Sequence, residues 1–159
     1  GGWVLSAYDL SGGVPDDLAR SLGEAAKRGR LVVTFHTRTE TYLPTPRLRQ
    51  AVDIAVAADA HAVAVHGSHA IGPVEQRGDT LVAWGLGNLV FNCACTDDTE
   101  GLILTLDGDG AAVHPIHAGL MGAVARPSAD AEGIFDLLIA LGSTPFERRG
   151  ATGVIRSGR

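Results

Sequence analysis

The sequence predicts an α/β fold in which βαβ units of a partly parallel sheet are followed by antiparallel strands. In the first half of the chain, short apolar runs alternate with helical segments in the order strand, helix, strand, helix, strand. This order is typical of a layered sheet with crossover helices. In the second half, apolar runs follow one another across short loops, as they do in antiparallel hairpins. The chain has 159 residues, the usual size of a single domain.

The chain begins with a strand candidate, a helix and a clearer strand. Residues 3–8 form a short apolar run that a Ser-Gly-Gly turn breaks. Residues 16–28 are predicted to be a helix because Pro15 suits a first turn, acidic residues follow it, and leucine and alanine recur on one face. Residues 31–35 read Leu-Val-Val-Thr-Phe, a strand run that ends at His36.

A second helix and a second strand run follow. Thr45 and Pro46 have the residue types of a helix N-cap and a first helical position. Apolar residues then recur at the spacing of one helical face; they are Leu48, Ala51, Val52, Ala55 and Val56. Residues 62–65 form the next apolar run, and His66 follows it. This alternation predicts that the strands are parallel.

The second half is predicted to be antiparallel. Short loops separate its apolar runs, which are residues 80–84, 89–91, 102–106 and 111–116. Asp-Gly-Asp-Gly at residues 107–110 has the composition of a hairpin turn. Ser128 is a candidate cap for a last helix, whose apolar face carries Ile134, Leu137, Leu138 and Leu141.

We assign residues 1–146 to a single domain and residues 147–159 to a loose C-terminal tail. From Glu147 onward the sequence is rich in arginine and glycine and has no apolar period, so it shows no pattern that predicts packing. The chain begins Gly1-Gly2-Trp3 without a methionine, which we interpret as the start of a processed protein or of a piece of a longer one.

Composition excludes several classes of function. The net charge of −5 and the pI of about 5.6 argue against a broad basic surface for nucleic acid. No run approaches the roughly 18 apolar residues of a membrane helix, so we expect no membrane segment in this chain. Cys93 and Cys95 are too few for a structural zinc site, and we interpret them as two loop thiols.

Three histidines follow strand runs and form the candidate site. They are His36, after the first clear strand, and His66 and His69, in the turn His-Gly-Ser-His after the next. Open α/β sheets bind ligands at the carboxyl ends of their strands, and neutral imidazole is a good ligand for divalent metals. We therefore expect a divalent metal, with Mn, Zn, Fe and Mg as candidates. The remaining histidines, at positions 61, 114 and 117, are expected to be structural.

Nearby polar residues are candidates to support these histidines. Glu40 and Glu75 each either fix a histidine tautomer or are solvated loop acids. Arg38 either holds an anionic substrate or is a surface arginine. Asn88, in the sequence Gly-Leu-Gly-Asn, either orients a ligand or fills a turn. This glycine-rich stretch lacks the P-loop pattern, and Ser68 lacks the surroundings of a serine nucleophile.

These motifs together resemble the C-terminal half of the CapA-type capsule-synthesis proteins of poly-gamma-glutamate biosynthesis. The resemblance is carried by Val33-Thr34-Phe35-His36 with Glu40 in register, Gln50, His66-Gly67-Ser68-His69, Val74-Glu75 and Gly85-Leu86-Gly87-Asn88-Leu89-Val90-Phe91. The sequence departs from the family pattern at Thr37-Arg38, where the family has Trp-Gly, and at His61, Val65 and Ser68. The family's N-terminal Gly-Asp and Asn-Asn-His segments do not occur in it, so we expect a partial domain.

The resemblance implies a layered, metallophosphatase-like fold of the four-layer sandwich type and metal-assisted hydrolysis of a phosphate ester or related bond. It implies His36, His66 and His69 as metal ligands, with His36 or His69 as a proton donor. Glu40, Asn88 and Arg38 would support them. The implied partners are an anionic small-molecule or polymer substrate and other capsule-synthesis proteins, in a bacterial cell envelope.

Two alternatives to the hypothesis of a metallophosphatase-like hydrolase stay open. In the first, the protein is a non-catalytic component of capsular polymer assembly or export with a degenerate metal site, an interpretation that the departures from the family pattern favour. In the second, it is a stand-alone hydrolase in which three imidazoles hold one metal ion and leave a position open for water.

Overall fold

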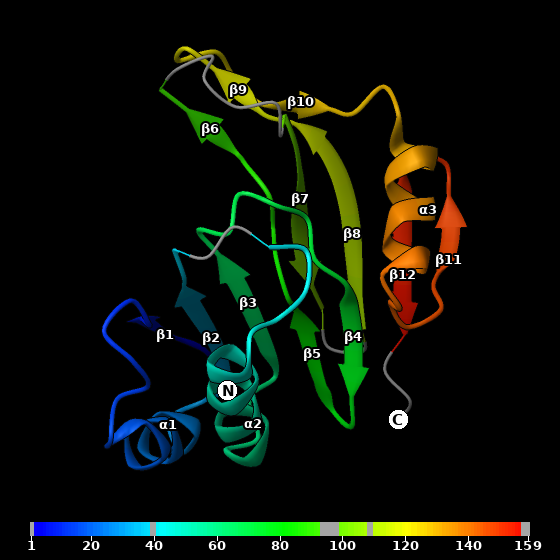
Figure 1. Ribbon diagram of the computed structural model, residues 1–159. Helices are drawn as coiled ribbons and strands as arrows, with labels where there is room; N and C mark the ends of the chain where they lie inside the picture. The colour runs from blue at the N-terminus through cyan, green and yellow to red at the C-terminus, as the bar shows by residue number, and fades with distance from the viewer. Residues whose placement is uncertain (1, 39–40, 93–98, 108–109, 157–159) are drawn as a thin grey trace.

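The computed structural model describes residues 2–38, 41–92, 99–107 and 110–156. Figure 1 shows a mixed α/β fold in which helices α1 and α2 cover one side of a first sheet, while a second sheet and helix α3 lie on the other side. The predicted α/β class, with a parallel sheet followed by antiparallel strands, is confirmed. No helix in the described ranges is long and apolar enough to cross a membrane.

The first sheet has the strand order β1-β2-β3-β5-β4. Its strands are β1 (Trp3–Asp9), β2 (Arg30–His36), β3 (Ala62–His66), β4 (Val74–Arg77) and β5 (Thr80–Ala83). Strands β1, β2 and β3 are parallel, as predicted. Strand β5, which was predicted to be antiparallel, is parallel to β3, and β4 is antiparallel to β5. Strand β4 is not predicted from the sequence, because Val-Glu-Gln-Arg has neither an apolar run nor a clear alternation.

The two crossover helices occur where the sequence predicted them. Helix α2 (Pro46–Ala57) begins at the predicted position, and the Thr45 hydroxyl caps it by accepting a hydrogen bond of 3.3 Å from the Leu48 amide. Helix α1 (Leu18–Ala26) is shorter than predicted. Its N-cap residue, Asp17, makes no capping hydrogen bond with its side chain, so the acidic residues before it do not extend the helix.

Alternation along the strands divides the interior into two hydrophobic clusters. Val33, Phe35 and Val63 point towards the helices and are buried with their apolar faces. Ala62 and Leu81 point the opposite way and are buried against the second sheet and α3. Successive side chains of a strand face opposite sides of a sheet, so the continuous apolar runs in the sequence correspond to strands that are buried on both faces.

The second sheet is built around β8. Its members are β7 (Glu100–Leu106), β8 (Gly110–His117), β10 (Arg126–Pro127), β11 (Glu147–Arg149) and β12 (Thr152–Arg156), and all its pairings are antiparallel. A separate short parallel pair joins β6 (Val90–Phe91) to β9 (Gly119–Leu120). The predicted hairpin joins β7 to β8, although residues 108 and 109 of its turn lie outside the described residues, as do Cys93 and Cys95.

Helix α3 (Ala131–Ala140) begins later than the predicted cap at Ser128. The Asp130 side chain is the N-cap, because its Oδ1 accepts a hydrogen bond of 3.1 Å from the Gly133 amide. The Ser128 hydroxyl instead accepts from the Asp130 amide at 3.1 Å. Ser128 therefore stabilises the turn before the helix.

The prediction of a loose tail from Glu147 is wrong over residues 147–156. Strand β12 pairs with β8, and Ile155, opposite Ala111, is only 1% exposed. Arg148 forms ion pairs with Glu132 and Asp136 of α3 at 2.5 and 2.6 Å. These contacts join segments that are distant in sequence, so a local apolar period cannot reveal them. Residues 157–159 lie outside the described residues.

Replacing Ile155 with alanine tests whether the C-terminal segment belongs to the core. We expect Ile155→Ala to lower the free energy of unfolding by about 2–5 kcal/mol, because it leaves a cavity beneath the second sheet. Ile103→Ala, at a position that is 42% exposed on β7, is the matched control and should change stability by about 0.5 kcal/mol or less. Urea denaturation measures both, and equal small effects would show that the segment does not pack.

Candidate functional site

Three polar side chains form a row across the carboxyl ends of adjacent parallel strands. Asp9 of β1 is paired in register with His36 of β2, which is paired in register with His66 of β3. Residues paired in register on parallel strands project to the same face of the sheet, here the face opposite the helices. We call Asp9, His36 and His66 the strand-end row. It lies where open α/β sheets bind ligands.

The side chains of the strand-end row are close to one another. The ring centroids of His36 and His66 are 5.2 Å apart, with 52° between the ring planes. Nδ1 of His36 lies 3.4 Å from Oδ1 of Asp9. A carboxylate only accepts hydrogen bonds, so this contact favours a proton on Nδ1 of His36 and leaves Nε2 as the nitrogen with the lone pair.

Backbone contacts beyond the strand ends hold the row in place. The Leu10 amide donates to the His36 carbonyl and the Thr37 amide to the His66 carbonyl, both at 2.9 Å. Gly67 follows with a φ of +85°, a conformation that glycine adopts readily. A Cβ atom at Gly67 would lie 2.6 Å from the His36 ring and closer still to the Thr37 carbonyl. Only glycine therefore fits here without displacing His36.

Asp9 is held in its charged form. Hydrogen bonds from the Ser11 hydroxyl at 2.5 Å and the Ser11 amide at 2.9 Å, with a smaller contribution from His36, lower the Asp9 pKa from 3.8 to about 2. Because this side chain is exposed to solvent, the shift describes its charge state and not a large stabilisation. Asp9 is therefore a permanent anion beside His36 at neutral pH.

His66 is held in its neutral form. Burial of part of the imidazole, and then the proximity of His36, lower its pKa below the usual 6.5. The His66 side chain is nevertheless exposed to solvent. Neutral imidazole is the form that binds a metal ion or accepts a proton.

His69 lies in the turn after the row and has different surroundings. Its φ of +57° is unusual for a residue other than glycine and costs about 1–3 kcal/mol. Its Nδ1 lies 2.8 Å from Oδ1 of buried Asn88, and its ring meets the edge of Phe91 at 5.1 Å. The Asn88 contact leaves Nε2 of His69 as the proton acceptor.

Among the described residues, no hydrogen bond or ring contact joins His69 to the strand-end row. His69 instead lines a small cavity of about 150 Å³ together with Tyr42 and Glu100. Gly87, next to Asn88, has a φ of +65° and packs against the Glu100 carbonyl with no room for a Cβ atom. This close packing positions Asn88 beneath His69.

The other predicted supporting residues are placed as follows. Arg38 is exposed and lines a pocket beside the row. Glu75 is on β4, paired with Val82. Glu40 lies outside the described residues. Asp9 was not predicted as a site residue, but it contacts His36 in the way that was expected of Glu40. The sequence offers one signal for it, because Asp9 directly follows the predicted strand run of residues 3–8.

The remaining histidines make contacts elsewhere. His61 packs edge-on against Trp3 at 5.0 Å, at the amino end of the sheet. His114 lies 3.0 Å from the Thr105 hydroxyl, and Nδ1 of His117 lies 3.1 Å from Oε1 of Glu100. Each has a local partner that accounts for its position.

Ligands for a metal are only partly assembled. In the stretches that the structure describes, no group of three or more His, Cys, Asp or Glu side chains is arranged to hold a metal ion. His36 and His66 are nevertheless adjacent. Two imidazoles that bind one zinc ion at about 2.0–2.1 Å in tetrahedral geometry have centroids roughly 5 Å apart. The centroid separation of the two rings is thus close to that of two imidazoles on one ion, and Asp9 contacts the Nδ1 atom of His36.

The charge state of Asp9 can be tested through Ser11. We expect the Asp9 pKa to be about 2 in the natural chain and to rise towards 3.8 in Ser11→Ala, because the hydroxyl donor is the largest cause of the shift. A carboxyl ¹³C NMR titration measures it. Ser21→Ala, which removes a hydroxyl bonded to Asp17, should leave Asp9 unchanged. An Asp9 pKa near 3.8 in the natural chain would contradict this description.

The charge state of His66 can be tested through pH. We expect His66 to titrate below 6.5, and its pKa to rise in His36→Asn while staying below 6.5, because burial is the larger cause. A folded-state pKa below the unfolded value means that the unfolded chain binds more protons. The contribution of His66 to stability is then complete above about 6.5 and is lost as the pH falls through the lowered pKa. Imidazole NMR measures the titration, and a His66 pKa above 6.5 would contradict the prediction.

None of the curated proteins matches the chain. The sequence model of a family described as bacterial capsule synthesis protein PGA_cap matches residues 8–93. This range is more than half of the chain, and it contains the strand-end row, His69 and Asn88. The chain therefore belongs to the bacterial capsule synthesis protein family, and its role is in capsule synthesis.

Proposed function

We propose that this protein acts in the synthesis of a poly-gamma-glutamate-type capsule as a metal-dependent hydrolase of phosphoester-type bonds, on a metallophosphatase-like sandwich fold. The observation that supports this proposal most is the pairing of His36 with His66, in register on adjacent strands and 5.2 Å apart between ring centroids. Two imidazoles at a sheet edge, one of them kept neutral by its surroundings, are suited to a divalent ion.

In this proposal His36 and His66 hold a divalent ion, and Asp9 orients His36. The Asp9 carboxylate accepts the Nδ1 proton of His36, which directs the basic nitrogen to the metal and raises its basicity. A bound divalent ion lowers the pKa of its water and polarises a phosphoryl oxygen. The described residues do not complete the coordination, so water, substrate or other ligands fill the remaining positions.

His69 is assigned a proton-transfer role. Asn88 fixes its tautomer through Nδ1, which leaves Nε2 able to exchange a proton with a leaving group. Its left-handed backbone is a strained arrangement of the kind that often occurs at functional sites. The partners in this proposal are an anionic substrate and other proteins of capsule synthesis.

The second candidate function is a non-catalytic role in polymer assembly or export. It is supported by Thr37-Arg38, which replaces the Trp-Gly that CapA-type sequences have after the first histidine. In that case the row keeps its geometry but supports no turnover. Metal affinity and turnover, measured separately, distinguish the two candidates.

Metal titration tests the proposed function. We expect chelator-treated protein to bind Mn²⁺ or Zn²⁺, and His66→Ala to weaken binding by at least about tenfold because it removes one of two adjacent imidazoles. Isothermal titration calorimetry measures the affinity, and turnover of an aryl phosphate measures the chemistry.

His61→Ala is the matched control, because it removes a histidine that directly precedes β3, at the end opposite His66, and should leave metal affinity unchanged. Metal binding with no turnover would favour the non-catalytic candidate. Equal metal affinity in His66→Ala and the natural chain would exclude this metal site.

A further inference from the structure

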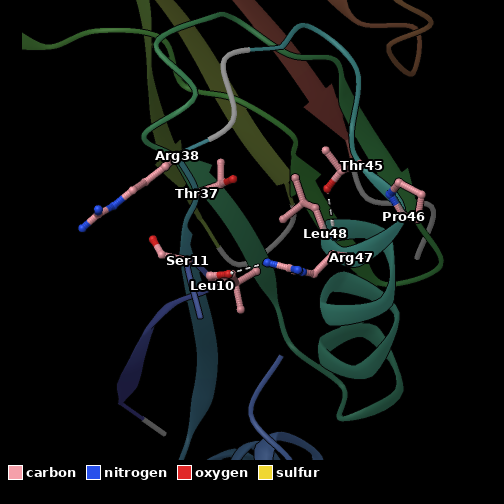
Figure 2. Close-up of a pocket in the computed structure, with 8 residues that line it drawn as sticks. All are labelled: Leu10, Ser11, Thr37, Arg38, Thr45, Pro46, Arg47 and Leu48. Carbon is pink, nitrogen blue, oxygen red and sulfur yellow. Dashed lines mark hydrogen bonds between the residues drawn. The ribbon is translucent and has the colours of Figure 1, made fainter. Parts of the chain in front are cut away.

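A pocket of about 480 Å³ adjoins the strand-end row. Figure 2 shows its lining, which combines arginine side chains, hydroxyls and the first turn of α2. It shares backbone with the row, because Leu10 follows Asp9, and Thr37 follows His36. The pocket therefore lies next to the end of the row, although His36 itself is not among its lining residues.

Arg47 is the best-placed cation of the pocket. It belongs to α2, and Figure 2 shows its side chain extending from the helix to the Leu10 backbone. One guanidinium nitrogen donates to the Leu10 carbonyl at 3.4 Å, which is a long hydrogen bond. A guanidinium has five N–H donors, so most of the donors of Arg47 remain available to a ligand.

Among the described residues, some cations are paired with carboxylates and others, including Arg28, Arg30, Arg49 and Arg126, are not. Arg20, Arg77 and Arg148 each form an ion pair with a carboxylate. Within the described residues, neither Arg47 nor Arg38 forms one. In a chain whose net charge is −5, two arginines without acidic partners on one pocket are a local excess of positive charge, and such an excess attracts anions.

The other polar groups of the pocket set its geometry. The guanidinium of Arg38 points away from Arg47 in Figure 2, so it reaches a ligand only by rotating about its flexible side chain. The Ser11 hydroxyl is engaged by Asp9 and the Thr45 hydroxyl by the Leu48 amide. Asp9, which is ionised at neutral pH, is the acidic neighbour of the pocket, and its carboxylate accepts hydrogen bonds from the Ser11 hydroxyl and amide.

We propose that this pocket binds an oxyanion, the carboxylate or phosphate of an anionic substrate, with Arg47 as the principal binding residue and Arg38 as a second, mobile contact. Guanidinium groups bind both oxyanions through paired hydrogen bonds. The assignment of the anion to a substrate rests on the proposed function, since the pocket would hold the charged part of a molecule whose reacting bond lies at His36 and His66. The binding of the anion itself does not depend on a metal.

The test is anion binding to the full, metal-free chain at low salt, with inorganic phosphate and glutarate as separate probes. We expect at least one probe to bind, and Arg47→Gln to weaken its affinity by about tenfold or more, because a charge-assisted hydrogen bond is lost. Arg49→Gln makes the same charge change on the same helix, at a residue that faces Trp84, and should bind as the natural chain does. Amide chemical shifts report both affinity and folding.

The two probes and two further variants identify which chemical group the pocket binds and which residue binds it. Phosphate binding alone assigns a phosphate ligand, and glutarate binding alone assigns a carboxylate ligand; either result supports the proposal. Arg47→Lys keeps the charge but loses the planar fork, so its affinity should fall between those of Arg47→Gln and the natural chain. His66→Ala should bind the anion normally, which separates this pocket from the metal site.

The proposal is overturned if neither probe binds, or if Arg47→Gln and Arg49→Gln weaken binding equally. Neither result would bear on metal affinity, which His66→Ala reports independently. Conversely, if the chain binds the anion but no metal, the proposal for the pocket is supported and the proposed hydrolase function is excluded.

Discussion

The in-register pairing of β1, β2 and β3 is the constraint on which the rest of the site depends. The register is locked by burial, because Val33 and Phe35 must face the helices, and a slip of one residue would turn them to the other side of the sheet. The same register aligns Asp9 with His36 and His36 with His66. The hydrophobic core therefore determines which polar side chains meet at the sheet edge.

The surroundings of Asp9 and His66 favour different charge states for these two side chains. Asp9 stays ionised because Ser11 donates two hydrogen bonds to it, and His66 tends to be neutral because part of its ring is buried. An anion that orients one imidazole, beside a second imidazole that carries no charge, is a suitable arrangement for binding a cation. The adjacent arginine-lined pocket has the opposite preference, so the edge combines a site suited to a cation with one suited to an anion.

Most of the first sheet could be predicted from sequence, because its strands are buried on both faces and read as apolar runs, and because Thr45 and Pro46 mark the start of α2. His36 and His66 were found because each ends such a run. Asp9 was missed because β1 lies at the sheet edge, where alternate residues are exposed and the run is weak. Strand β12 was missed because only its pairing with β8, distant in sequence, makes it a strand. The contact between His69 and Asn88 likewise depends on how the turns fold together.

The most direct test of the central claim is anomalous diffraction from crystals of this chain soaked with zinc. A shared ion predicts one strong peak between His36 and His66, about 2.0–2.1 Å from a nitrogen of each ring, with Asp9 still bonded to His36. Well-ordered rings in the present arrangement with no peak between them at saturating zinc would contradict it. The strand-end row would then be a structural pairing of histidines and not a metal centre.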